Sequence, residues 1–376
     1  MSNELSSVVL FRDFIEDRRT SMDVYADNLQ TALRTVVGAA TEVRAFTPRP
    51  ICLSGPGTPP GQWPMRLSRY LAYPFQAFSQ QGGINHIVDH GYGHLLYCLD
   101  PKRTVVTVHD IIPSLAWRGV IPNRGVPHRP LLGEFSLRAI KRAARVIADS
   151  ESTKMDLVEY LDFPPGRINV IHIGVADRFR PFDELSRRDA RVSFGLPQNT
   201  KVILITGWQH YKNHAACVDA FMELCRSASD DVRLVRLGRR TDEWQRMVLE
   251  RNIGDKVVEI EWLEEDRMIA LYNAVDLLLF PSLHEGFGLP PLESMACGTP
   301  VVTSNAASLP EIIGDAGLMA APDDVDAFVR GMKDMLHDKA LRNDYIQRGL
   351  AQAKRFTWAK CAMDVHSIYL EIAKGT

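Results

Sequence analysis

Two glutamates eight residues apart are the residues of this sequence whose types and spacing could do chemistry. They are Glu285 and Glu293, at either end of the string "EGFGLPPLE". Between them Gly286 and Gly288 lack a side chain, so a ligand can come within hydrogen-bonding distance of the backbone. An ionised carboxylate only accepts hydrogen bonds, so each glutamate suits a partner that is rich in hydroxyl groups.

The residues around this string predict a strand, a loop and a helix. The apolar run "VDLLLFPS" (275–282) predicts a buried strand, and "PPLESMACG" (290–298) predicts a short helix with proline in its first turn and Gly298 at its end. A helix N-terminus presents unpaired N–H groups and a partial positive charge, which suits a diphosphate. Glu293, expected in the first turn, would accept both hydroxyls of a ribose, and Glu285 would bind another hydroxylated group. Together these features indicate a nucleotide-sugar site; the alternative is a purely structural turn.

The elements that must position this string alternate between strands and helices along the chain. Such alternation predicts α/β structure with parallel, doubly wound sheets, in which ligands bind beyond the carboxyl ends of the strands. Nine short β-branched runs are expected to be strands: 6–11, 103–110, 145–150, 168–174, 201–207, 232–238, 257–263, 275–282 and 299–304. Helical patterns lie between them, and the pattern becomes all-helical after residue 320.

The length of the chain, 376 residues, favours two domains. The polar segment 175–200 holds two prolines and one glycine and no strand pattern, so we interpret it as the linker between two Rossmann-like domains. The expected ranges are 1–178 for the N-terminal, acceptor-side domain, 179–355 for the C-terminal, nucleotide-sugar-binding domain and 356–376 for a C-terminal helix.

Composition and charge exclude some classes of protein. The formal net charge of −2 lacks the basic excess of a nucleic-acid binder. Residues 1–150 nevertheless hold 17 Lys and Arg against 12 Asp and Glu. This excess suits an anionic substrate or a membrane surface, and is equally compatible with ordinary scatter. The six cysteines form no C-x-x-C pair, and the sequence contains neither a signal-peptide pattern nor a long apolar run. We therefore expect a cytoplasmic protein, with the inner face of the membrane as its peripheral location.

The segment 281–317, "PSLHEGFGLPPLESMACGTPVVTSNAASLPEIIGDAG", resembles the signature of the retaining glycosyltransferases of family 4, which have the GT-B fold. The two glutamates match the E-x7-E element of that family. Further resemblance lies in "TVVTVHDIIPS" (104–114), in 145–181 and near the C-terminus. It covers most of the chain from about residue 86. The resemblance implies two Rossmann-like domains with an active site in the cleft between them and a C-terminal helix that crosses back to the first domain.

The resemblance also implies roles for individual residues. Glu285 would bind sugar hydroxyls, Glu293 the ribose, Lys212 the departing phosphate, and His109 would face the donor sugar. Backbone N–H groups toward the sugar and diphosphate would come from Gly286, Phe287, Gly288 and Leu289. The negative charge of a departing nucleoside diphosphate is an independent physical reason for a cation such as Lys212.

Two departures from the family pattern stand out. Relatives often carry an arginine directly before the lysine, where this chain has Tyr211, so Arg239 or Arg240 is a candidate for the missing charge. Relatives also often have a glycine-rich turn after the first strand. Here residues 17–28, "DRRTSMDVYADN", contain no glycine.

Four other patterns in the sequence have the residue types of a functional site. His86, His90 and His94 have helical spacing, but Gly91 and Gly93 disfavour one continuous helix, and we expect His90 and His94 in the acceptor cleft rather than on a metal. The D-x-D of "DDVD" (323–326) predicts an N-cap, so no metal cofactor is expected. The glycine- and proline-rich segment 55–61 is too rich in proline to open a Rossmann helix. Finally, aromatic and arginine residues in 62–81 suit an interfacial segment that touches lipid headgroups, and equally a helix buried in the N-terminal domain.

Taken together, these expectations describe a retaining hexosyltransferase. It would move a hexose, with mannose from GDP-mannose as the first choice, to a hydroxyl of a glycan or lipid-linked acceptor in the synthesis of surface polysaccharide or glycolipid. Partners would be the nucleotide-sugar, the acceptor and the membrane surface, without nucleic acid. Two alternatives are a nucleotide-sugar epimerase on the same fold and a non-catalytic nucleotide-sugar-binding protein.

Overall fold

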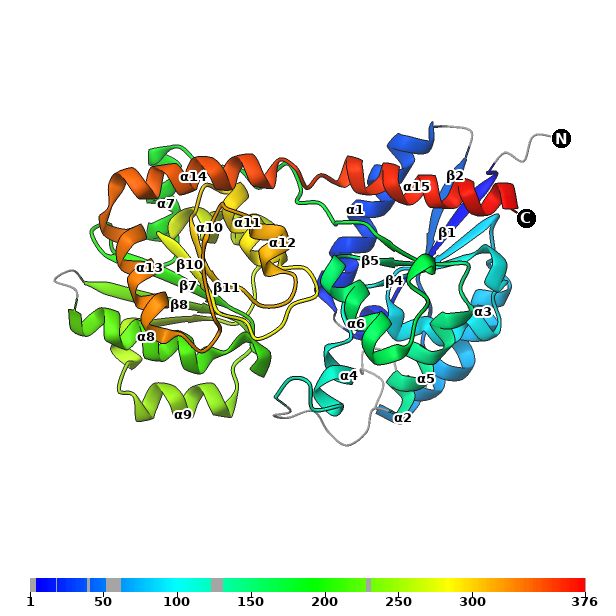
Figure 1. Ribbon diagram of the computed structural model, residues 1–376, viewed down its shortest axis with the longest axis horizontal. Helices are drawn as coiled ribbons and strands as arrows, with labels where there is room; N and C mark the ends of the chain where they lie inside the picture. The colour runs from blue at the N-terminus through cyan, green and yellow to red at the C-terminus, as the bar shows by residue number, and fades with distance from the viewer. Residues whose placement is uncertain are drawn as a thin grey trace. The chain divides into compact units, whose positions relative to one another are not determined.

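The computed structural model describes residues 5–17, 19–38, 41–51, 62–122, 131–227 and 231–375. Two compact units make up the chain (Figure 1). Unit 1 consists of residues 1–120, 126–174 and 357–376, and unit 2 consists of residues 121–125 and 175–356. In the structure the chain passes from unit 1 to unit 2 after residue 174 and back to unit 1 after residue 356. The domain boundaries expected from the sequence lie after residues 178 and 355. The segment 55–61 discussed above lies outside the described residues.

Unit 1 contains a parallel six-stranded sheet in the order β2-β1-β3-β4-β5-β6 among its described residues. Its middle strands are fully buried, because apolar β-branched residues fit between two helical layers. The strands are β1 Ser7–Phe11, β2 Glu42–Phe46, β3 Ile84–Ile87, β4 Thr104–Val108, β5 Arg145–Ala148 and β6 Ile168–Val170.

The last helix of the chain belongs to unit 1 and packs against its first helix (Figure 1). The Nδ1 atom of His86 lies 2.5 Å from the hydroxyl of Tyr369, and the rings of Tyr25 and Trp358 are in edge contact. The helices and short turns of unit 1 are η1 Ile15–Asp17, α1 Thr20–Val37, α2 Gln62–Leu67, η3 Ser68–Ala72, α3 Tyr73–Phe78, η4 His90–Tyr97, η5 Pro101–Arg103, α4 Ile112–Trp117, α5 Leu131–Ala139, η6 Ile140–Arg142, α6 Glu151–Leu161, η7 Pro165–Arg167 and α15 Trp358–Gly375.

Unit 2 contains a second parallel six-stranded sheet in its described part, in the order β12-β11-β10-β7-β8-β9. Strand order reverses between β7 and β10, which are neighbours, and ligands of doubly wound folds bind at such a reversal. The strands are β7 Lys201–Thr206, β8 Val232–Leu237, β9 Val257–Ile260, β10 Leu277–Phe280, β11 Val301–Ser304 and β12 Leu318–Ala320.

Helices cover both faces of this sheet, with α8 and α9 on one side and α10 and α11 on the other (Figure 1). The α8 helix packs with α13 over a core of fully buried side chains such as Phe221 and Phe328. The helices and short turns of unit 2 are α7 Glu184–Ser193, η8 His210–Lys212, α8 His214–Ser227, α9 Asp242–Glu250, η9 Gly254–Lys256, α10 Glu265–Ala274, α11 Leu289–Ala296, α12 Leu309–Ile313, α13 Val325–His337 and α14 Lys339–Ala353.

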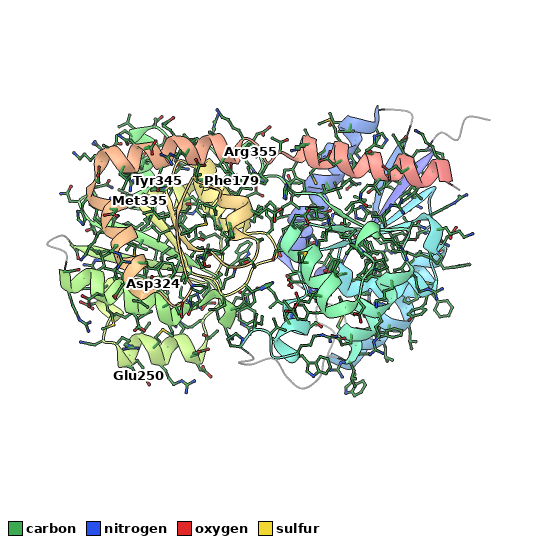
Figure 2. All side chains as sticks on the ribbon, viewed as in Figure 1. Phe179, Glu250, Asp324, Met335, Tyr345 and Arg355 are labelled. Carbon is green, nitrogen blue, oxygen red and sulfur yellow. The ribbon has the colours of Figure 1, made fainter. Side chains whose placement is uncertain are left out.

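The predicted fold class is confirmed, since each unit is a doubly wound α/β layer structure. All nine predicted strands are present. The sequence pattern missed β2, β3 and β12, which are half-exposed, polar or very short. The expected linker 175–200 is part of unit 2: it contains α7, and Phe179, labelled in Figure 2, packs its ring 6.2 Å from that of Tyr272.

The segment 62–78 forms consecutive helical turns whose apolar side chains lie largely outside the core. Tyr73 and Ala77 are buried, whereas large side chains at four-residue spacing on the other face are exposed. Burial in the N-terminal domain therefore applies to only one face of this segment. None of the helices in the described ranges is both long and apolar enough to cross a bilayer.

Candidate active site

The residues singled out in unit 2 lie where the strand order of its sheet reverses. Lys212 is in η8, which follows β7, and Glu285 is in the loop after β10. The two strands pair directly, so parallel geometry brings the segments that follow them to the same edge of the sheet. Backbone contact joins these segments as well, because the N–H of Leu283 donates to the carbonyl of Tyr211 at 2.7 Å.

Lys212 and Glu285 form an ion pair in this structure. The Nζ atom of Lys212 lies 2.7 Å from Oε1 of Glu285, and both side chains are about nine-tenths buried. The ammonium also lies 4.6 Å from the centre of the Phe280 ring, a cation–π distance. A buried charge requires such partners, since an unpaired ion in a dry site is strongly disfavoured. The pair therefore holds a preformed positive and negative group next to each other.

Gly207 makes room for the lysine. Its backbone has φ +92°, and a Cβ atom there would lie 2.7 Å from Cγ of Lys212. Any side chain at this position would thus push the lysine stem out of place. The glycine ends β7 and lets the chain turn sharply into the segment that leads to η8.

Ser308, a residue that the sequence analysis missed, holds the Gly-Phe-Gly loop by hydrogen bonds. The buried hydroxyl of Ser308 lies 3.0 Å from the carbonyl oxygen of Glu285 and 2.8 Å from that of Phe287. Phe287 itself is buried, with its ring in edge contact with Phe356. The two hydrogen bonds from Ser308 fix the directions of the Glu285 and Phe287 carbonyls. The only signal in the sequence was a serine just before the Leu-Pro that starts α12, which is a common helix-start pattern.

Gly288 begins α11 in the left-handed region, with φ +107°. A Cβ atom there would lie 2.9 Å from a methyl group of Leu309. Leu289 is the first helical residue and Pro290 and Pro291 follow it, so the predicted short helix with proline in its first turn is confirmed. Gly298, at φ +74°, follows the end of the helix as expected.

The expectation that Glu293 lies in the first turn of this helix is wrong. The helix begins at Leu289, which makes Glu293 its fifth residue and places it in the second turn. Its Oε2 atom accepts a hydrogen bond of 2.8 Å from the hydroxyl of Tyr272 on α10. Burial raises the pKa of Glu293 to about 8, and the Tyr272 hydrogen bond offsets only part of this effect. The carboxyl group is therefore preorganised as an acceptor that is largely protonated near neutral pH.

Arg239, the candidate for the missing cation, is an exposed residue just after β8. Its guanidinium lies 5.9 Å from the ring centre of Trp208, which follows β7. Arg240 pairs with Glu259 at 3.2 Å instead. Of the two arginines, Arg239 is thus the one whose charge lies beside the β7 segment that carries Lys212.

His109 lies in unit 1, directly after β4, and is buried between two acceptors. Its Nδ1 atom lies 2.5 Å from Oδ2 of Asp149, and its Nε2 atom lies 2.9 Å from the carbonyl of Val88. Because neither partner can donate to it, both ring nitrogens must carry a proton. Burial opposes this charge, but the Asp149 carboxylate outweighs it and raises the pKa of His109 to about 9. His109 is therefore an imidazolium at neutral pH.

The two histidines expected in the acceptor cleft have different surroundings. His94 is buried, with its ring nitrogens 3.1 Å from the hydroxyl of Ser136 and 2.9 Å from the carbonyl of Arg69, and burial lowers its pKa to about 4. It thus connects η3 to α5. His90 is half-buried at the start of η4, with Nδ1 3.3 Å from Oδ1 of Asp89. Of the pair, only His90 has the exposure to contact a ligand.

A charged cluster replaces the glycine-rich turn after the first strand of unit 1. Arg19 pairs with Asp89, which follows β3, and lies 3.9 Å from Asp13, which follows β1. Burial and the neighbouring Asp89 raise the pKa of Asp13 to about 9, so Asp13 is neutral while Asp89 is charged. Sequence reasoning missed this cluster. The signal available was an aspartate two residues after the end of β1 and another two residues after the end of β3, strands that are neighbours in the sheet.

Metal ligands do not gather anywhere in the described ranges, which contain no group of three or more His, Cys, Asp or Glu side chains suited to a metal ion. His86 is bound to Tyr369 and Thr107 rather than turned toward His90 or His94. Asp324, labelled in Figure 2, caps α13 by accepting from the N–H of Ala327 at 2.9 Å, as predicted for the D-x-D string.

Comparison with protein families gives two matches that together span most of the chain. Residues 186–352 match the family described as "Glycosyl transferases group 1", and residues 19–179 match "Glycosyltransferase Family 4". The first match contains Lys212, Glu285 and Glu293, and the second contains His109.

Characterised relatives include two proteins from Escherichia coli. The chain is 30% identical over 274 residues to O-antigen chain mannosyltransferase B, which covers 71% of this chain and 70% of that protein. It is 32% identical over 271 residues to the serotype-specific mannosyltransferase WbdA, which covers 70% of this chain. The matched region spans only about a third, 32%, of the length of WbdA.

Among solved structures, the chain is similar to sucrose-phosphate synthase from Thermosynechococcus elongatus. The TM-score is 0.78 over 99% of this chain and 100% of that one, at 19% sequence identity. At that identity the likeness concerns the fold, and it extends over both units.

Proposed function

Because the chain belongs to the family 4 glycosyltransferases, which have the GT-B fold, we propose that it moves a hexose from a nucleotide-sugar to an acceptor hydroxyl, with retention of the anomeric configuration. The observation that carries this proposal is the buried ion pair of Lys212 and Glu285 at the strand-order reversal of unit 2. It offers a cation to a diphosphate and a carboxylate to sugar hydroxyls within one hydrogen-bond length.

Lys212 is the group that stabilises the leaving diphosphate. Negative charge grows on the bridging oxygen as the glycosidic bond breaks, and a fixed cation in a dry site lowers the energy of that state. The contribution of one such contact is about 3 kcal/mol, or about 10²-fold in rate. Its pairing with Glu285 keeps the ammonium in place before the donor binds, and Gly207 keeps its stem there.

Glu293 is the acceptor for the ribose hydroxyls. Its second-turn position and its bond to Tyr272 hold one carboxyl oxygen, which leaves the other oxygen for a ligand. Hydroxyl donors from a ribose favour the ionised form, so nucleotide binding and loss of the Glu293 proton are coupled. The backbone from Gly286 to Leu289 supplies N–H groups beside this site, at the start of α11.

Retention is proposed to proceed by attack on the same face from which the diphosphate leaves. A double displacement requires a carboxylate nucleophile. Glu285 is bound to Lys212 and Glu293 to Tyr272, so both have other contacts. In front-face attack the departing phosphate oxygen takes the proton of the acceptor hydroxyl, the new glycosidic bond forms and the sugar–phosphate bond breaks. His109, an imidazolium in unit 1, would contribute positive charge facing the donor sugar.

We propose GDP-mannose as the donor and a glycan or lipid-linked sugar as the acceptor, in surface-polysaccharide or glycolipid synthesis. The support is that two relatives, at 32% and 30% identity, are mannosyltransferases by name. No metal cofactor is proposed, because Lys212 supplies the charge that a metal ion would otherwise bring to the diphosphate.

Peripheral contact with the cytoplasmic face of the membrane is proposed for the exposed side of 62–78, here called the apolar stripe. It consists of Trp63, Leu67, Leu71, Phe75 and Phe78, of which Trp63 is 73% and Phe75 is 82% exposed. Interfacial helices combine such a face with cations. Arg66 lies over the Trp63 ring, and neighbouring α5 and η6 add exposed Arg138, Lys141 and Arg142, while the one acid of α5, Glu134, is buried.

Calorimetric titration with GDP, UDP, ADP and dTDP, without metal, tests the central proposal. Binding of GDP supports mannosyl transfer. Binding of another nucleotide instead would mean that the donor is a sugar carried by that nucleotide. Absence of binding by all four, also with magnesium, overturns the nucleotide-sugar proposal. Incubation with GDP-mannose then separates the alternatives: an epimerase converts the donor without acceptor, and a binding protein leaves it intact. The anomeric configuration of the transferred mannose, read by NMR, tests retention.

Vesicle co-sedimentation tests the apolar stripe. The protein is expected to bind vesicles of phosphatidylglycerol and phosphatidylcholine about tenfold more tightly than Trp63→Ser or Phe75→Ser, since each variant loses one exposed aromatic side chain that would insert among the lipids. Leu249→Ser, which changes an exposed leucine of unit 2, is the matched control and should bind as the parent does. Equal binding by all four proteins would contradict membrane docking through this face.

A further inference from the structure

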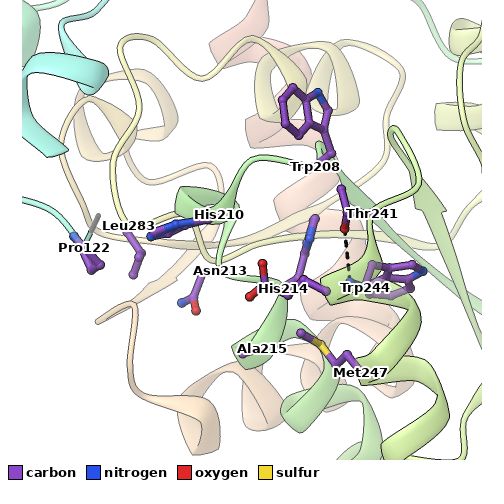
Figure 3. Close-up of a pocket in the computed structure, with 11 residues that line it drawn as sticks. Pro122, Trp208, His210, Asn213, His214, Ala215, Thr241, Trp244, Met247 and Leu283 are labelled. Carbon is purple, nitrogen blue, oxygen red and sulfur yellow. Dashed lines mark hydrogen bonds between the residues drawn. The ribbon is translucent and has the colours of Figure 1, made fainter. Parts of the chain in front are cut away.

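A pocket of about 230 Å³ lies in unit 2 at the starts of two helices (Figure 3). Its walls come from the β7 segment, with Trp208 and His210, from the beginning of α8, with His214, and from the beginning of α9, with Thr241 and Trp244. The same short turn η8 that contributes His210 contributes Lys212. The pocket is therefore next to the proposed diphosphate site, on the α8–α9 side of the sheet, whereas Glu293 bonds to α10 on the other side.

His214 presents an unsatisfied acceptor here. Its Nε2 atom is buried, and no residue in the described part of the chain gives it a hydrogen-bond partner. The ring is bonded to the backbone of Thr206, and burial with the nearby charge of Arg236 lowers the pKa of His214 to about 3. A neutral histidine that donates from Nδ1 keeps a lone pair on Nε2. A buried polar atom of this kind normally has a partner, and His214 is one of the residues that line the pocket.

Asn213 adds a second acceptor. Its amide nitrogen donates to the carbonyls of Pro281, at 3.1 Å, and Pro322, at 2.8 Å. Both amide hydrogens are thereby used, which leaves Oδ1 as the atom that can bind a ligand. Since Asn213 directly follows Lys212, this acceptor is fixed relative to the lysine by one peptide unit.

Donors line the same space. The first N–H groups of α8, at His214 and Ala215, have no acceptor within their helix. The hydroxyl of Thr241 caps α9 by accepting from the N–H of Trp244 at 3.2 Å, drawn as the dashed line in Figure 3, so its own hydrogen is available for donation.

A wall that offers both donors and acceptors selects ligands whose groups do both, and hydroxyl groups have this property. Trp208, 46% exposed at the pocket, adds an aromatic surface for the C–H face of a ring. An anion fits less well, because Glu243 also lines the pocket and acidic residues already occupy the first turn of α9.

From these contacts we infer that this pocket is a sugar-binding subsite that holds a unit of the acceptor glycan other than the one that bears the reacting hydroxyl. The inference rests on the proposed transferase function for its role in the reaction. Binding of a glycan in the pocket rests only on the donors, acceptors and aromatic surface described above. The site is distinct from the donor site, since its polar groups are on the α8–α9 side of η8.

Saturation-transfer NMR with α-linked mannotriose, and with maltotriose for comparison, tests binding directly and needs no nucleotide. The parent protein is expected to bind mannotriose, with transfer to the sugar protons. His214→Phe keeps a ring but removes the acceptor nitrogen, and Trp208→Ala removes the exposed aromatic surface. Each is expected to weaken binding about tenfold, the equivalent of about 1.4 kcal/mol. Trp208 is half-exposed, so this variant should fold even if His214→Phe does not.

Glu250→Ala is the matched control, since Glu250 is an exposed residue of α9 that does not line the pocket. Unchanged mannotriose binding in both pocket variants, or no binding of either trisaccharide to the parent protein, would overturn the inference. Preference for maltotriose would support a sugar-binding subsite but contradict mannose as its ligand.

Transfer kinetics connect the subsite to the reaction. With mannotriose as acceptor, both variants should raise the acceptor KM about tenfold and change kcat less than about twofold, whereas the KM for methyl α-mannoside should stay unchanged. Equal increases in KM for mannotriose and for methyl α-mannoside would show that the pocket does not act as a subsite for a further sugar unit. If mannotriose binds but no nucleotide does, the transferase proposal fails while the sugar site stands, so the two failures are distinguishable.

Discussion

The ammonium of Lys212 and the carboxylate of Glu285 are 2.7 Å apart, although 72 residues separate them in the chain. Two adjacent parallel strands, β7 and β10, bring them together. The pair is buried and charged before any ligand binds, so its electrostatic field is set by the fold rather than assembled during the reaction.

Removing the cation is expected to slow transfer rather than to abolish donor binding. Lys212→Ala should lower kcat about 10²-fold, because the leaving diphosphate loses its charge partner. Rates of nucleotide release from the donor at saturating acceptor give this number. Lys354→Ala, which removes an exposed lysine of the same unit, is the control and should leave kcat as it is. A kcat within about twofold of the parent in Lys212→Ala would exclude the leaving-group role.

Glu293 should make both stability and nucleotide affinity depend on pH, in opposite directions. Its pKa is raised from 4.5 to about 8, so between these values the folded state binds more protons than the unfolded state, and stability falls as pH rises. The expected loss from about pH 5 to about pH 8 is on the order of 3 kcal/mol. Urea denaturation should show this loss in the parent and a smaller one in Glu293→Gln.

Nucleotide affinity should rise over the same window, because ribose hydroxyls donate to the ionised carboxylate. In Glu293→Gln the affinity should be lower and nearly independent of pH. A parallel pH profile in parent and variant would show that Glu293 does not contact the nucleotide.

The pairing of His109 and Asp149 should be visible in the titration of the histidine. Asp149→Asn removes the charge that outweighs burial, so the pKa of His109 should drop from about 9 to below its ordinary value of 6.5. In the parent, stability from this pair is fully present below 6.5 and is lost as pH rises toward 9. The NMR shifts of the His109 ring protons in both proteins measure the change.

Thr31→Ala is the control for the histidine titration, because it removes an exposed hydroxyl of unit 1 that bonds only within α1. A titration midpoint of His109 that is unaffected by loss of Asp149 would contradict the ion pair.

Gly288→Ala should lower stability and nucleotide affinity, because it strains the backbone of the loop that supplies N–H groups to the donor. The added methyl group would meet Leu309 at 2.9 Å in a conformation with φ +107°, at a cost of about 1–3 kcal/mol. Thermal unfolding should show a lower Tm, and calorimetry a lower GDP affinity. Gly166→Ala, where the added methyl group would meet open space, should leave both unchanged. A neutral result at Gly288 would show that the loop can take another conformation.

Much of this architecture could be predicted from the sequence because buried parallel strands are continuous apolar runs. β2 and β12 lack that pattern because they are edge strands, which are stabilised by pairing rather than by their own composition. β3 lacks it because Asn85 and His86 interrupt its apolar run. Lys212, Glu285 and the glycine loop follow from a motif with a clear strand–loop–helix context. Ser308, by contrast, acts through two carbonyl contacts that no local pattern encodes.

The apolar stripe shows the same limit in another form. Apolar residues at four-residue spacing occur on buried and on exposed helix faces alike. The sequence therefore could not choose between core and interface for 62–78, and the burial of Tyr73 beside the exposure of Phe75 shows that the segment has both faces. His94 was likewise expected to contact ligands. Its ring instead hydrogen-bonds to η3 and α5, two elements that are distant from it in the sequence.

The return of α15 to unit 1 has a consequence for how this protein is made. His86, deep in the first sheet, takes its hydrogen-bond partner Tyr369 from the last eight residues of the chain, and Tyr25 takes Trp358 from the beginning of the same helix. On the ribosome, unit 2 can therefore complete its core as soon as its own residues emerge, whereas the earlier-made unit 1 lacks these two contacts until α15 has emerged. The half that is synthesised first is the half that finishes folding last.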